Sequence, residues 1–406
     1  MDARQRLFSP VRLGPIQTPN RFVKCATYET RGRRGLVTDE LIAWHREFAA
    51  GGTGTCTLAY CAVAGEGRTF PDQIVVNDAA APGLARFADT MHTAGARAAI
   101  QLGHAGWFAD PHATGVRPLG PSKMFAPKGL RWSRPFASGD FARVRDEFAR
   151  AARLAVDAGF DGLEVHVGHG YLLSQFLSPY NNRRRDGYGG SVENRSRFPR
   201  EVVCAVRAAI GDRAALWIKL NMEDGFGGGL TVDDGLEVAR LFERDGALDA
   251  IQLTGGHTTK SPMFLMRGAT PLAELIANQP TAFQRAVMRV VMPRVVRSYD
   301  FEEAFFLPTA RRFRAAVKLP LMLLGGVTKL STMTRAMDEG FDFIALGRAL
   351  IRQPDLVRRL EAGSLDASPC TPCNQCMAHV GVRPTVCPFH EAERAESDPR
   401  YLSGRL

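Results

Sequence analysis

Short, continuous apolar runs recur along the chain, and each follows a helical pattern that ends in glycine. The pattern appears in five segments, at residues 49–58, 93–102, 157–166, 244–253 and 338–347. Glycine commonly closes a helix in the left-handed conformation. An apolar run without polar alternation is typical of a strand that is covered on both faces. The repeated order of helix and strand therefore predicts a parallel sheet.

Three further apolar runs, at residues 21–27, 215–221 and 319–326, bring the predicted strands to eight. Helical patterns with Ser, Thr or Asp near their starts occupy residues 38–51, 139–159 and 331–340. Eight strand–helix units predict an α/β fold of the (β/α)8 barrel type over residues 1–365. No Gly-x-Gly-x-x-Gly sequence follows a strand, so we expect no separate dinucleotide-binding domain.

Two segments do not fit the repeat. Residues 257–298 are too long for a simple loop and contain helical patterns rich in Met and Arg. We expect them to form an inserted lid or excursion between strands six and seven. Residues 366–406 follow the last barrel unit and contain half of the cysteines, so we expect a short Cys-rich C-terminal extension.

Composition narrows the class of protein. The chain has 406 residues, of which 45% are hydrophobic, enough for a large globular core. It shows neither a signal-peptide pattern at the start nor a long uncharged apolar run, so we expect a cytoplasmic protein without a membrane partner. The net charge of +10 comes mostly from scattered arginine without a recognition pattern. We therefore expect phosphate- or carboxylate-bearing ligands and not nucleic acid.

The candidate chemistry lies where the fourth predicted strand ends. Barrel enzymes bind ligands at the carboxyl ends of their strands. His166, His169 and Tyr171 follow the apolar strand there, and all three side chains can donate a hydrogen bond or a proton. A structural role, with imidazoles bonded to backbone carbonyls and a half-buried tyrosine, is the alternative for any one of them. Three such residues within six positions favour catalysis.

These residues belong to a longer resemblance. The segment HVGHGYLLSQFLSPYNNRRRDGYGGSVENRSRF, together with NRF at 20–22, AIQLGHAG at 99–106, LLGGVT at 323–328 and ALGRALIRQPDL at 345–356, resembles the old yellow enzyme family of flavin-dependent ene-reductases. The resemblance implies a barrel that binds FMN, NAD(P)H as the electron donor in the same pocket, and an activated alkene as substrate. It also implies that His166 and His169 hold the substrate's carbonyl oxygen and that Tyr171 donates a proton to the α-carbon. Preorganised donors of this kind stabilise the developing enolate.

The resemblance assigns the cofactor contacts as well. Gln101 would bond the pyrimidine edge of the flavin, and Lys219, where the family carries Arg or Lys, would face N1 and O2. The remaining predicted contacts are Ala26, Thr27, Tyr28, Ala59 and Tyr60 around the ring, and Gly325, Gly326, Gly347 and Arg348 at the phosphate. The chain departs from the family pattern at Tyr28, Tyr60 and Trp107, which puts the redox tuning and the shape of the substrate pocket in doubt.

The eight cysteines form two groups. Cys25, Cys56, Cys61 and Cys204 are scattered in apolar segments, where we expect ordinary reduced thiols. Cys370, Cys373, Cys376 and Cys387 have the spacing C-x2-C-x2-C-x10-C. This spacing resembles the [4Fe–4S] site in the family's larger branch, which includes dienoyl-CoA reductases and trimethylamine dehydrogenase. By spacing alone a zinc ion is a comparable interpretation, and reduced thiols in a structural turn are a third.

The leading hypothesis is therefore an FMN-dependent ene-reductase that NAD(P)H reduces in a ping-pong cycle. A second hypothesis is the flavin and iron–sulfur component of a multi-subunit reductase or dehydrogenase with a separate electron-transfer partner. A third, from another class, is a barrel aldolase with Lys219 as its Schiff-base lysine. A flavin-binding protein without catalysis would have little use for the two histidines and the tyrosine. Homo-oligomerisation is compatible with each of these hypotheses.

Overall fold

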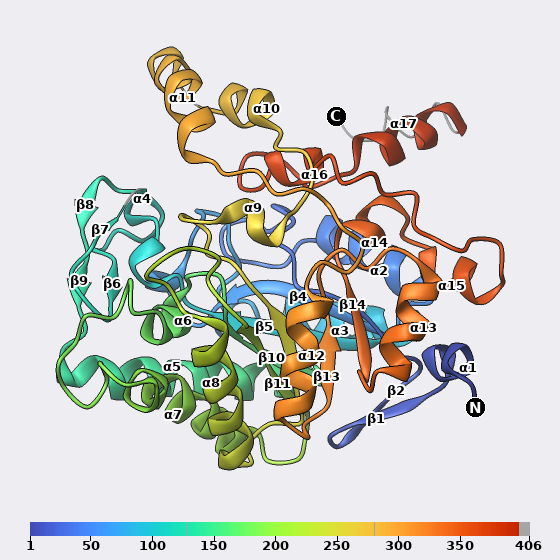
Figure 1. The fold of residues 1–406 in the computed structure, drawn as a ribbon, viewed down its shortest axis with the longest axis horizontal. Coiled ribbons are helices and arrows are strands. Elements are labelled where there is room, and N and C mark those ends of the chain that lie inside the picture. Colours follow the sequence, from blue (N-terminus) through green and yellow to red (C-terminus); the bar gives the residue numbers. More distant parts are fainter. Residues whose placement is uncertain (127, 280, 398–406) are drawn as a thin grey trace.

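The computed structural model describes residues 1–126, 128–279 and 281–397, and its centre is a closed barrel of eight strands (Figure 1). Every strand pairs in parallel with the next barrel strand along the chain, and the last pairs with the first. The predicted (β/α)8 barrel is confirmed. Its strands are β3 (Phe22–Lys24), β4 (Thr55–Ala62), β5 (Arg97–Gly103), β10 (Gly162–Val167), β11 (Ala215–Asn221), β12 (Ala250–Thr254), β13 (Leu321–Leu323) and β14 (Phe343–Leu346).

The continuous apolar runs have the physical cause that the pattern predicts. Every residue of β4, β10 and β11 is buried, because helices cover one face of the strands and the packed barrel interior covers the other. The interior is tightly filled: a Cβ atom on Gly162 would lie only 2.5 Å from Cζ3 of Trp217. Only glycine therefore fits at the start of β10.

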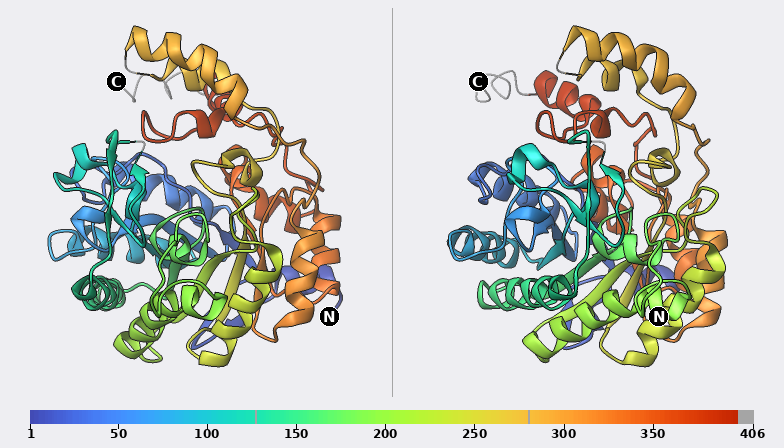
Figure 2. Two further views of the ribbon diagram at one scale, coloured as in Figure 1. Left: turned by 60° about the vertical axis from the view of Figure 1, so that its left-hand side comes forward. Right: turned by 90° about the vertical axis from the view of Figure 1, so that its left-hand side faces the viewer.

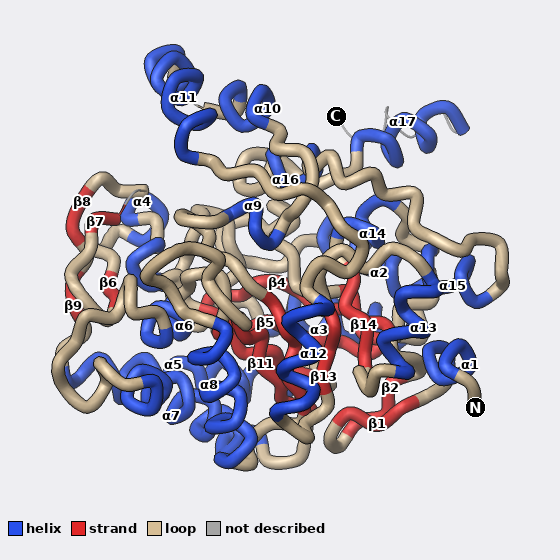
Figure 3. Tube along the Cα trace, viewed as in Figure 1, coloured by secondary structure: helices blue, strands red, loops and turns tan. Residues whose placement is uncertain are grey.

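Helices surround the strands as an outer layer, as Figure 3 shows. The three helices predicted at 38–51, 139–159 and 331–340 are α2, α5 and α13, each correct to within two residues at either end. Gly159 and Gly340 follow two of these helices with φ of +93° and +86°, the left-handed conformation expected for the recurring glycine. The helices of this layer are α2 (Asp39–Ala50), α3 (Ala81–Thr93), α5 (Ser138–Asp157), α7 (Val192–Ile210), α8 (Val232–Asp245), α12 (Leu307–Ala316), α13 (Leu330–Asp338), α14 (Arg348–Arg352) and α15 (Leu356–Glu361).

Shorter elements complete the barrel ends. At the amino end of the chain, α1 (Ala3–Phe8) precedes the hairpin of β1 (Val11–Leu13) and β2 (Ile16–Thr18). On the side of the strands' carboxyl ends lie η1 (Gly65–Gly67), η2 (Gly106–Phe108), α4 (Pro111–Thr114) and α6 (Leu172–Leu177). The loop between β5 and α5 also forms two small pairs, β6 (Leu119–Gly120) with β9 (Arg134–Pro135), and β7 (Phe125–Ala126) with β8 (Arg131–Trp132).

The predicted excursion is present between β12 and β13. It contains α9 (Pro262–Leu265), α10 (Leu272–Ala277) and α11 (Ala282–Val295). Figure 2 shows α10 and α11 standing apart from the barrel. No described side chain of α11 is buried, and Phe283 and Val295 are 78% and 63% exposed. The helical pair α10–α11 is therefore not a lid packed on the barrel.

The described part of the C-terminal extension folds back over the barrel and contains α16 (Gln375–Ala378) and α17 (Pro388–Ser397). Its backbone is tied to the loop after β3, where Thr385 N donates to Glu29 O at 2.9 Å. Asn374 Nδ2 donates to the carbonyls of Met266 at 2.6 Å and Ala269 at 2.9 Å, which fixes the extension to the excursion. Residues 398–406 of the predicted extension lie outside the described residues.

None of the described helices is both long enough and apolar enough to cross a lipid bilayer.

Candidate active site

One large cavity, with a volume of about 400 Å³, opens at the carboxyl ends of the barrel strands. It is lined by residues of β4, β5, β10, β11 and β14 and by the segments that follow β3, β12 and β13. Every residue predicted to act on substrate or hold the cofactor lines it: Ala26, Thr27, Tyr28, Ala59, Tyr60, Gln101, His166, His169, Tyr171, Lys219, Gly325, Gly326, Gly347 and Arg348. The structure thus gathers these residues in one place, while their roles remain predictions.

The two histidines lie side by side in the cavity wall. Their ring centroids are 5.1 Å apart, and the ring of Tyr171 lies 4.8 Å from that of His166. Burial lowers the pKa of His166 well below its ordinary value, and neighbouring His169 and Lys219 lower it further. Burial likewise lowers the pKa of His169 to about 3, with Lys219 and His257 acting in the same direction. Both rings are therefore neutral near pH 7, and each can donate one N–H.

The backbone at His169 is held in an uncommon conformation. Its φ is +61°, in the left-handed region that is uncommon for residues other than Gly, although Asn, Asp and His adopt it more often than the rest. The surroundings fix it from both sides: His169 N donates to Asn221 Oδ1 at 3.0 Å, and Thr258 Oγ1 donates to His169 O at 2.6 Å. The ring nitrogen Nε2 lies 2.9 Å from Thr254 Oγ1, which leaves Nδ1 for a ligand. Strain of this kind is concentrated at functional sites.

Tyr171 stands at the N-terminal end of α6, among aromatic rings. Tyr60 packs against it edge to face at 5.1 Å, and Phe108 does so at 6.2 Å. Burial raises the pKa of Tyr171 to about 12, while hydrogen bonding with Thr69 and Thr258 opposes the rise. The phenol therefore stays protonated through the physiological range and keeps a proton to donate.

A buried polar network underlies the predicted contacts of the flavin ring. Glu164, which is fully buried in β10, accepts from Gln101 Nε2 at 2.6 Å and from Trp217 Nε1 at 2.8 Å. Lys219 Nζ lies 3.0 Å from the same carboxylate. Glu164 thus fixes the positions of both the amide and the ammonium group that the cofactor would meet. An ammonium group paired with a buried carboxylate is also a poor nucleophile, which disfavours the Schiff-base hypothesis.

Removing the cation of the buried Lys219–Glu164 ion pair should strongly lower the stability of the folded protein. Lys219→Met would leave the Glu164 carboxylate buried without its cation, and breaking a buried pair in this way costs about 3–5 kcal/mol. We expect a lower free energy of unfolding in urea for Lys219→Met and a smaller loss for Lys219→Arg. The double variant Lys219→Met/Glu164→Gln should recover part of the loss. A Lys219→Met protein as stable as the parent would contradict the pairing.

The opposite end of the cavity suits a phosphate group. Gly325 and Gly326 have φ of +111° and +72°, and a Cβ on Gly325 would lie 2.4 Å from Phe306, so only glycine fits there. Glycine leaves the backbone N–H groups uncovered for a ligand. Arg348, on β14's following helix, supplies a guanidinium group, and Nη1 donates to Arg267 O at 3.1 Å. Together with the amide, the ammonium and the cavity volume, these groups fit FMN.

The three residues that depart from the family pattern, Tyr28, Tyr60 and Trp107, lie in different positions relative to the cavity. Tyr28 stacks on Phe70 with 4.6 Å between centroids and lines the cavity. Tyr60 also lines it, but its hydroxyl points to the loop after β4, 2.6 Å from Thr69 Oγ1. Trp107 does not line the cavity; it is buried in a separate cluster with Met124. Only the two tyrosines therefore shape the pocket.

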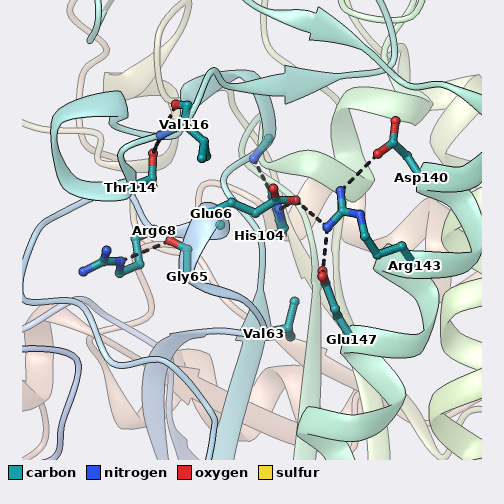
Figure 4. Close-up of polar contacts among 12 residues, drawn as sticks. Val63, Gly65, Glu66, Arg68, His104, Thr114, Val116, Asp140, Arg143 and Glu147 are labelled. Atoms are coloured by element: carbon teal, nitrogen blue, oxygen red, sulfur yellow. Dashed lines mark hydrogen bonds and ion pairs between the residues drawn. The ribbon is translucent and has the colours of Figure 1, made fainter.

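The loop after β4 is anchored to α5 by ion pairs (Figure 4). Glu66 Oε1 lies 2.7 Å from Arg143 Nη1, which lies 2.8 Å from Glu147 of the same helix. Asp140 is the third carboxylate of the group, 3.1 Å from Arg143 Nη2. This network fixes residues 68–70, which approach the cavity from the side of Tyr171.

The four clustered cysteines line one small cavity of about 10 Å³ together with Arg348 and Arg352. Burial raises the pKa of Cys370 to about 11 and that of Cys376 to about 12, and Arg348 opposes both shifts. Among the described residues, no three Cys, His, Asp or Glu side chains lie close enough to hold a single metal ion. The described arrangement therefore surrounds a hollow beside two arginines but does not form a ready-made zinc site.

Several contributors to the site were not predicted from the sequence. Glu164 could have been identified from the sequence, since it is an acidic residue within the apolar run of a strand covered on both faces. Phe70, Phe108 and Thr258 could not, because their approach to the cavity depends on contacts distant in sequence. Within the predicted excursion at 257–298, the residues that line the cavity lie at 257–266, in its first part.

Comparison with known proteins decides the family. A sequence profile of the NADH:flavin oxidoreductase / NADH oxidase family matches residues 6–366. The chain belongs to this family. The old yellow enzyme resemblance is confirmed, and with it a flavin-dependent oxidoreductase, so the aldolase hypothesis is set aside.

One relative matches almost from end to end. The 4,4'-dithiodibutanoate disulfide reductase of Rhodococcus erythropolis is 45% identical over 394 residues, covering 97% of each chain. Several other curated relatives are longer, and the chain spans about half of their length, between 50% and 53%.

Solved structures agree with the fold. A 2-naphthoyl-CoA reductase bound to 2-naphthoyl-CoA has a TM-score of 0.83 and 26% identity, over 98% of this chain and 59% of that one. An old yellow enzyme homologue from Zymomonas mobilis has a TM-score of 0.71 over 95% and 98% of the two chains. At 23% identity, this second likeness shows the fold alone.

Proposed function

We propose that the protein is an FMN-dependent reductase that NAD(P)H reduces and that then reduces an activated alkene, such as an α,β-unsaturated carbonyl compound. The observation that supports the proposal is that two neutral imidazoles and a phenol line the same cavity as the residues predicted to bind the flavin. Gln101, Lys219, Gly325, Gly326, Gly347 and Arg348 would hold FMN, which when bound supplies hydride transfer.

The protein's own groups would act on the substrate. His166 and His169 would donate hydrogen bonds to the carbonyl oxygen, where negative charge develops as the β-carbon gains a hydride. Neutral donors suit this role because they orient the oxygen without adding a formal charge beside the flavin site. Tyr171 would then give its proton to the α-carbon, with Tyr60 and Phe108 packing edge to face on its ring to hold it in place.

The match with the Rhodococcus enzyme favours a second candidate, reduction of an organic disulfide. Two electrons and two protons convert a disulfide into two thiols; NAD(P)H supplies both electrons and one proton equivalent as hydride, and water supplies the other proton. A thiolate, with an ordinary thiol pKa of about 8.5, leaves without needing an acid. The same cavity could therefore serve this reaction without Tyr171.

The oxidative half-reaction distinguishes the two candidates. The enzyme, reduced with NADPH without oxygen, is mixed with 2-cyclohexenone or with 4,4'-dithiodibutanoate while the flavin absorbance is followed. We expect rapid reoxidation by the enone. Reoxidation by the disulfide alone would favour the second candidate, and reoxidation by neither would contradict the proposal.

We also propose that Cys370, Cys373, Cys376 and Cys387 hold a [4Fe–4S] cluster, because all four line one cavity beside two arginines that would balance its negative charge. We expect four iron atoms and four acid-labile sulfides per chain after anaerobic purification. Cys373→Ser should lose most of both, whereas Cys204→Ser, at an exposed thiol, should keep them. Stoichiometric zinc, or no metal, would contradict the cluster. The presence of a cluster would favour the hypothesis that the protein is the flavin and iron–sulfur component of a multi-subunit reductase or dehydrogenase with a separate electron-transfer partner.

A further inference from the structure

We infer that Lys128 forms a carboxylate-binding subsite beside the cavity, so that the substrates are small organic acids whose carboxylate lies away from the group that is reduced. The inference deepens the proposed function and rests on it. Nothing in the family resemblance assigns a role to this lysine, which lies between β7 and β8.

Lys128 projects onto two rings that belong to the cavity wall. Its Nζ is 3.9 Å from the centroid of Phe70 and 5.2 Å from that of Phe108. Both rings line the cavity, and Phe108 in turn packs edge to face against Tyr171. Lys128 does not itself line the cavity; its ammonium group lies against these two wall rings, one of which contacts the predicted proton donor.

The charge of Lys128 lacks an anion. Its Nζ donates to Thr69 O, but no carboxylate lies within ion-pair distance among the described residues. Lys24 and Lys219, the other lysines near the barrel interior, each pair with a buried glutamate. An ammonium group has three N–H donors, and only one has an acceptor in the described structure. The two remaining donors can bind a carboxylate.

Partial burial makes an anion favourable at this position. Burial lowers the pKa of Lys128 to about 8, and Asp110 opposes the shift only from a distance beyond that of an ion pair. A bound carboxylate would stabilise the charged form in surroundings that water screens poorly. Aromatic faces alone stabilise a cation more weakly than a direct ion pair does.

The subsite would be firmly positioned relative to Tyr171. The backbone carbonyl of Thr69 accepts from Lys128, and its Oγ1 lies 2.6 Å from the hydroxyl of Tyr60, whose ring packs on Tyr171 at 5.1 Å. The preceding residues of this loop are tied to α5 through Glu66 and Arg143, 2.7 Å apart (Figure 4). A carboxylate held by Lys128 would thus be placed at a fixed separation from the proton donor.

The name of one relative agrees with substrates that are organic acids. The name of the Rhodococcus enzyme specifies a dicarboxylate, 4,4'-dithiodibutanoate. If the same class is bound here, one of its two carboxylates would meet Lys128 while the sulfur atoms lie farther inside the cavity.

The test compares an acid with its neutral ester. KM is measured for 6-oxohept-4-enoate, whose carboxylate is separated from the alkene by two methylene groups, and its methyl ester, and for 4,4'-dithiodibutanoate and its dimethyl ester. In Lys128→Met the ratio of KM for the acid to KM for the ester should rise about tenfold, the factor expected when one charge-assisted contact is lost. Lys128→Gln provides a second neutral variant should the first fold poorly. In Lys123→Met the ratio should keep its parental value, because Lys123 lies 5.5 Å over the half-exposed Trp132 near the same hairpin.

The pH dependence gives an independent readout. Lys128 is charged below its pKa of about 8 and neutral above it, so KM for the acid should rise from pH 7 to pH 9 in the parent. KM for the ester should not follow that rise, and the Lys128→Met protein should lack it.

A purely structural role predicts a different result. If Lys128 only fastens the loop between β7 and β8 to Phe70, its loss changes KM for acid and ester by the same factor, and this outcome overturns the inference while the proposed function stands. Calorimetric titration with 4,4'-dithiodibutanoate covers the case in which neither pair is reduced. Equal affinity of the parent and Lys128→Met proteins would overturn the inference, and the absent turnover would separately overturn the proposed function.

Discussion

Replacing Tyr171 with phenylalanine is expected to slow alkene reduction by about 10²- to 10⁴-fold, the range that a positioned general acid contributes. The α-carbon of an enolate must receive a proton, and the buried phenol beside His166 is placed to give it. Reduction of the flavin by NAD(P)H needs no such proton, so that half-reaction should stay close to the parental rate. Stopped-flow absorbance measures the two half-reactions separately.

The same variant also separates the two candidate substrates. Disulfide reduction releases a thiolate that leaves without an acid, so Tyr171→Phe should slow it less than tenfold, or about 1.4 kcal/mol. Tyr180→Phe is the matched control, because Tyr180 packs on Phe226 and His257 but does not line the cavity. An equal loss in both half-reactions of Tyr171→Phe would refute its role as proton donor.

Removing both imidazoles, in His166→Ala/His169→Ala, is expected to weaken the binding of 4-hydroxybenzaldehyde and to slow alkene reduction by about 10²- to 10³-fold, the effect of losing oxyanion donors. The phenol's oxygen would occupy the place of the substrate's carbonyl oxygen. Its affinity is measured from the change in flavin absorbance on titration.

Two further variants make the histidine result interpretable. His169→Asn keeps a side chain that tolerates a φ of +61° and can still donate a hydrogen bond, so it should retain more activity than His169→Ala. His112→Ala changes an exposed histidine and should bind the phenol as the parent does. Unchanged phenol affinity in the double variant would remove the pair from the oxyanion role.

The lowered pKa values of His166 and His169 also predict how the stability of the folded state depends on pH. Burial lowers the pKa of His169 to about 3, so that ring does not titrate between pH 5 and 8, and burial lowers the pKa of His166 well below its ordinary value. The unfolded chain binds protons at these histidines below about pH 6.5 while the folded chain does not, so the two rings make the folded state less stable as pH falls through that value.

The barrel was predictable because its cause is local. The strands had to be apolar on both faces, and five of them followed a helix that ends at a glycine, such as Gly159 with its positive φ. The catalytic candidates were predictable for a related reason, since residues that follow a barrel strand must face the same mouth. His166, Gln101 and Lys219 were located by that rule together with the family resemblance.

The unpredicted parts depend on contacts between segments that are distant along the chain. Lys128 is an unremarkable turn lysine in the sequence, and only the fold places it against Phe70 and Phe108, two rings of the cavity wall. The excursion was expected, but its amphipathic patterns do not reveal that α11 stands clear of the barrel. The cysteine spacing left a cluster, a zinc ion and a structural turn of reduced thiols open, and in the structure all four cysteines line one hollow.

The absorption spectrum of the purified protein shows directly whether the barrel cavity binds FMN that NAD(P)H can reduce. We expect a yellow protein with FMN bound at one molecule per chain, whose flavin absorbance is bleached by NAD(P)H in the absence of oxygen. A colourless protein that takes up no FMN when the cofactor is supplied, or a bound flavin that NAD(P)H does not reduce, would contradict it.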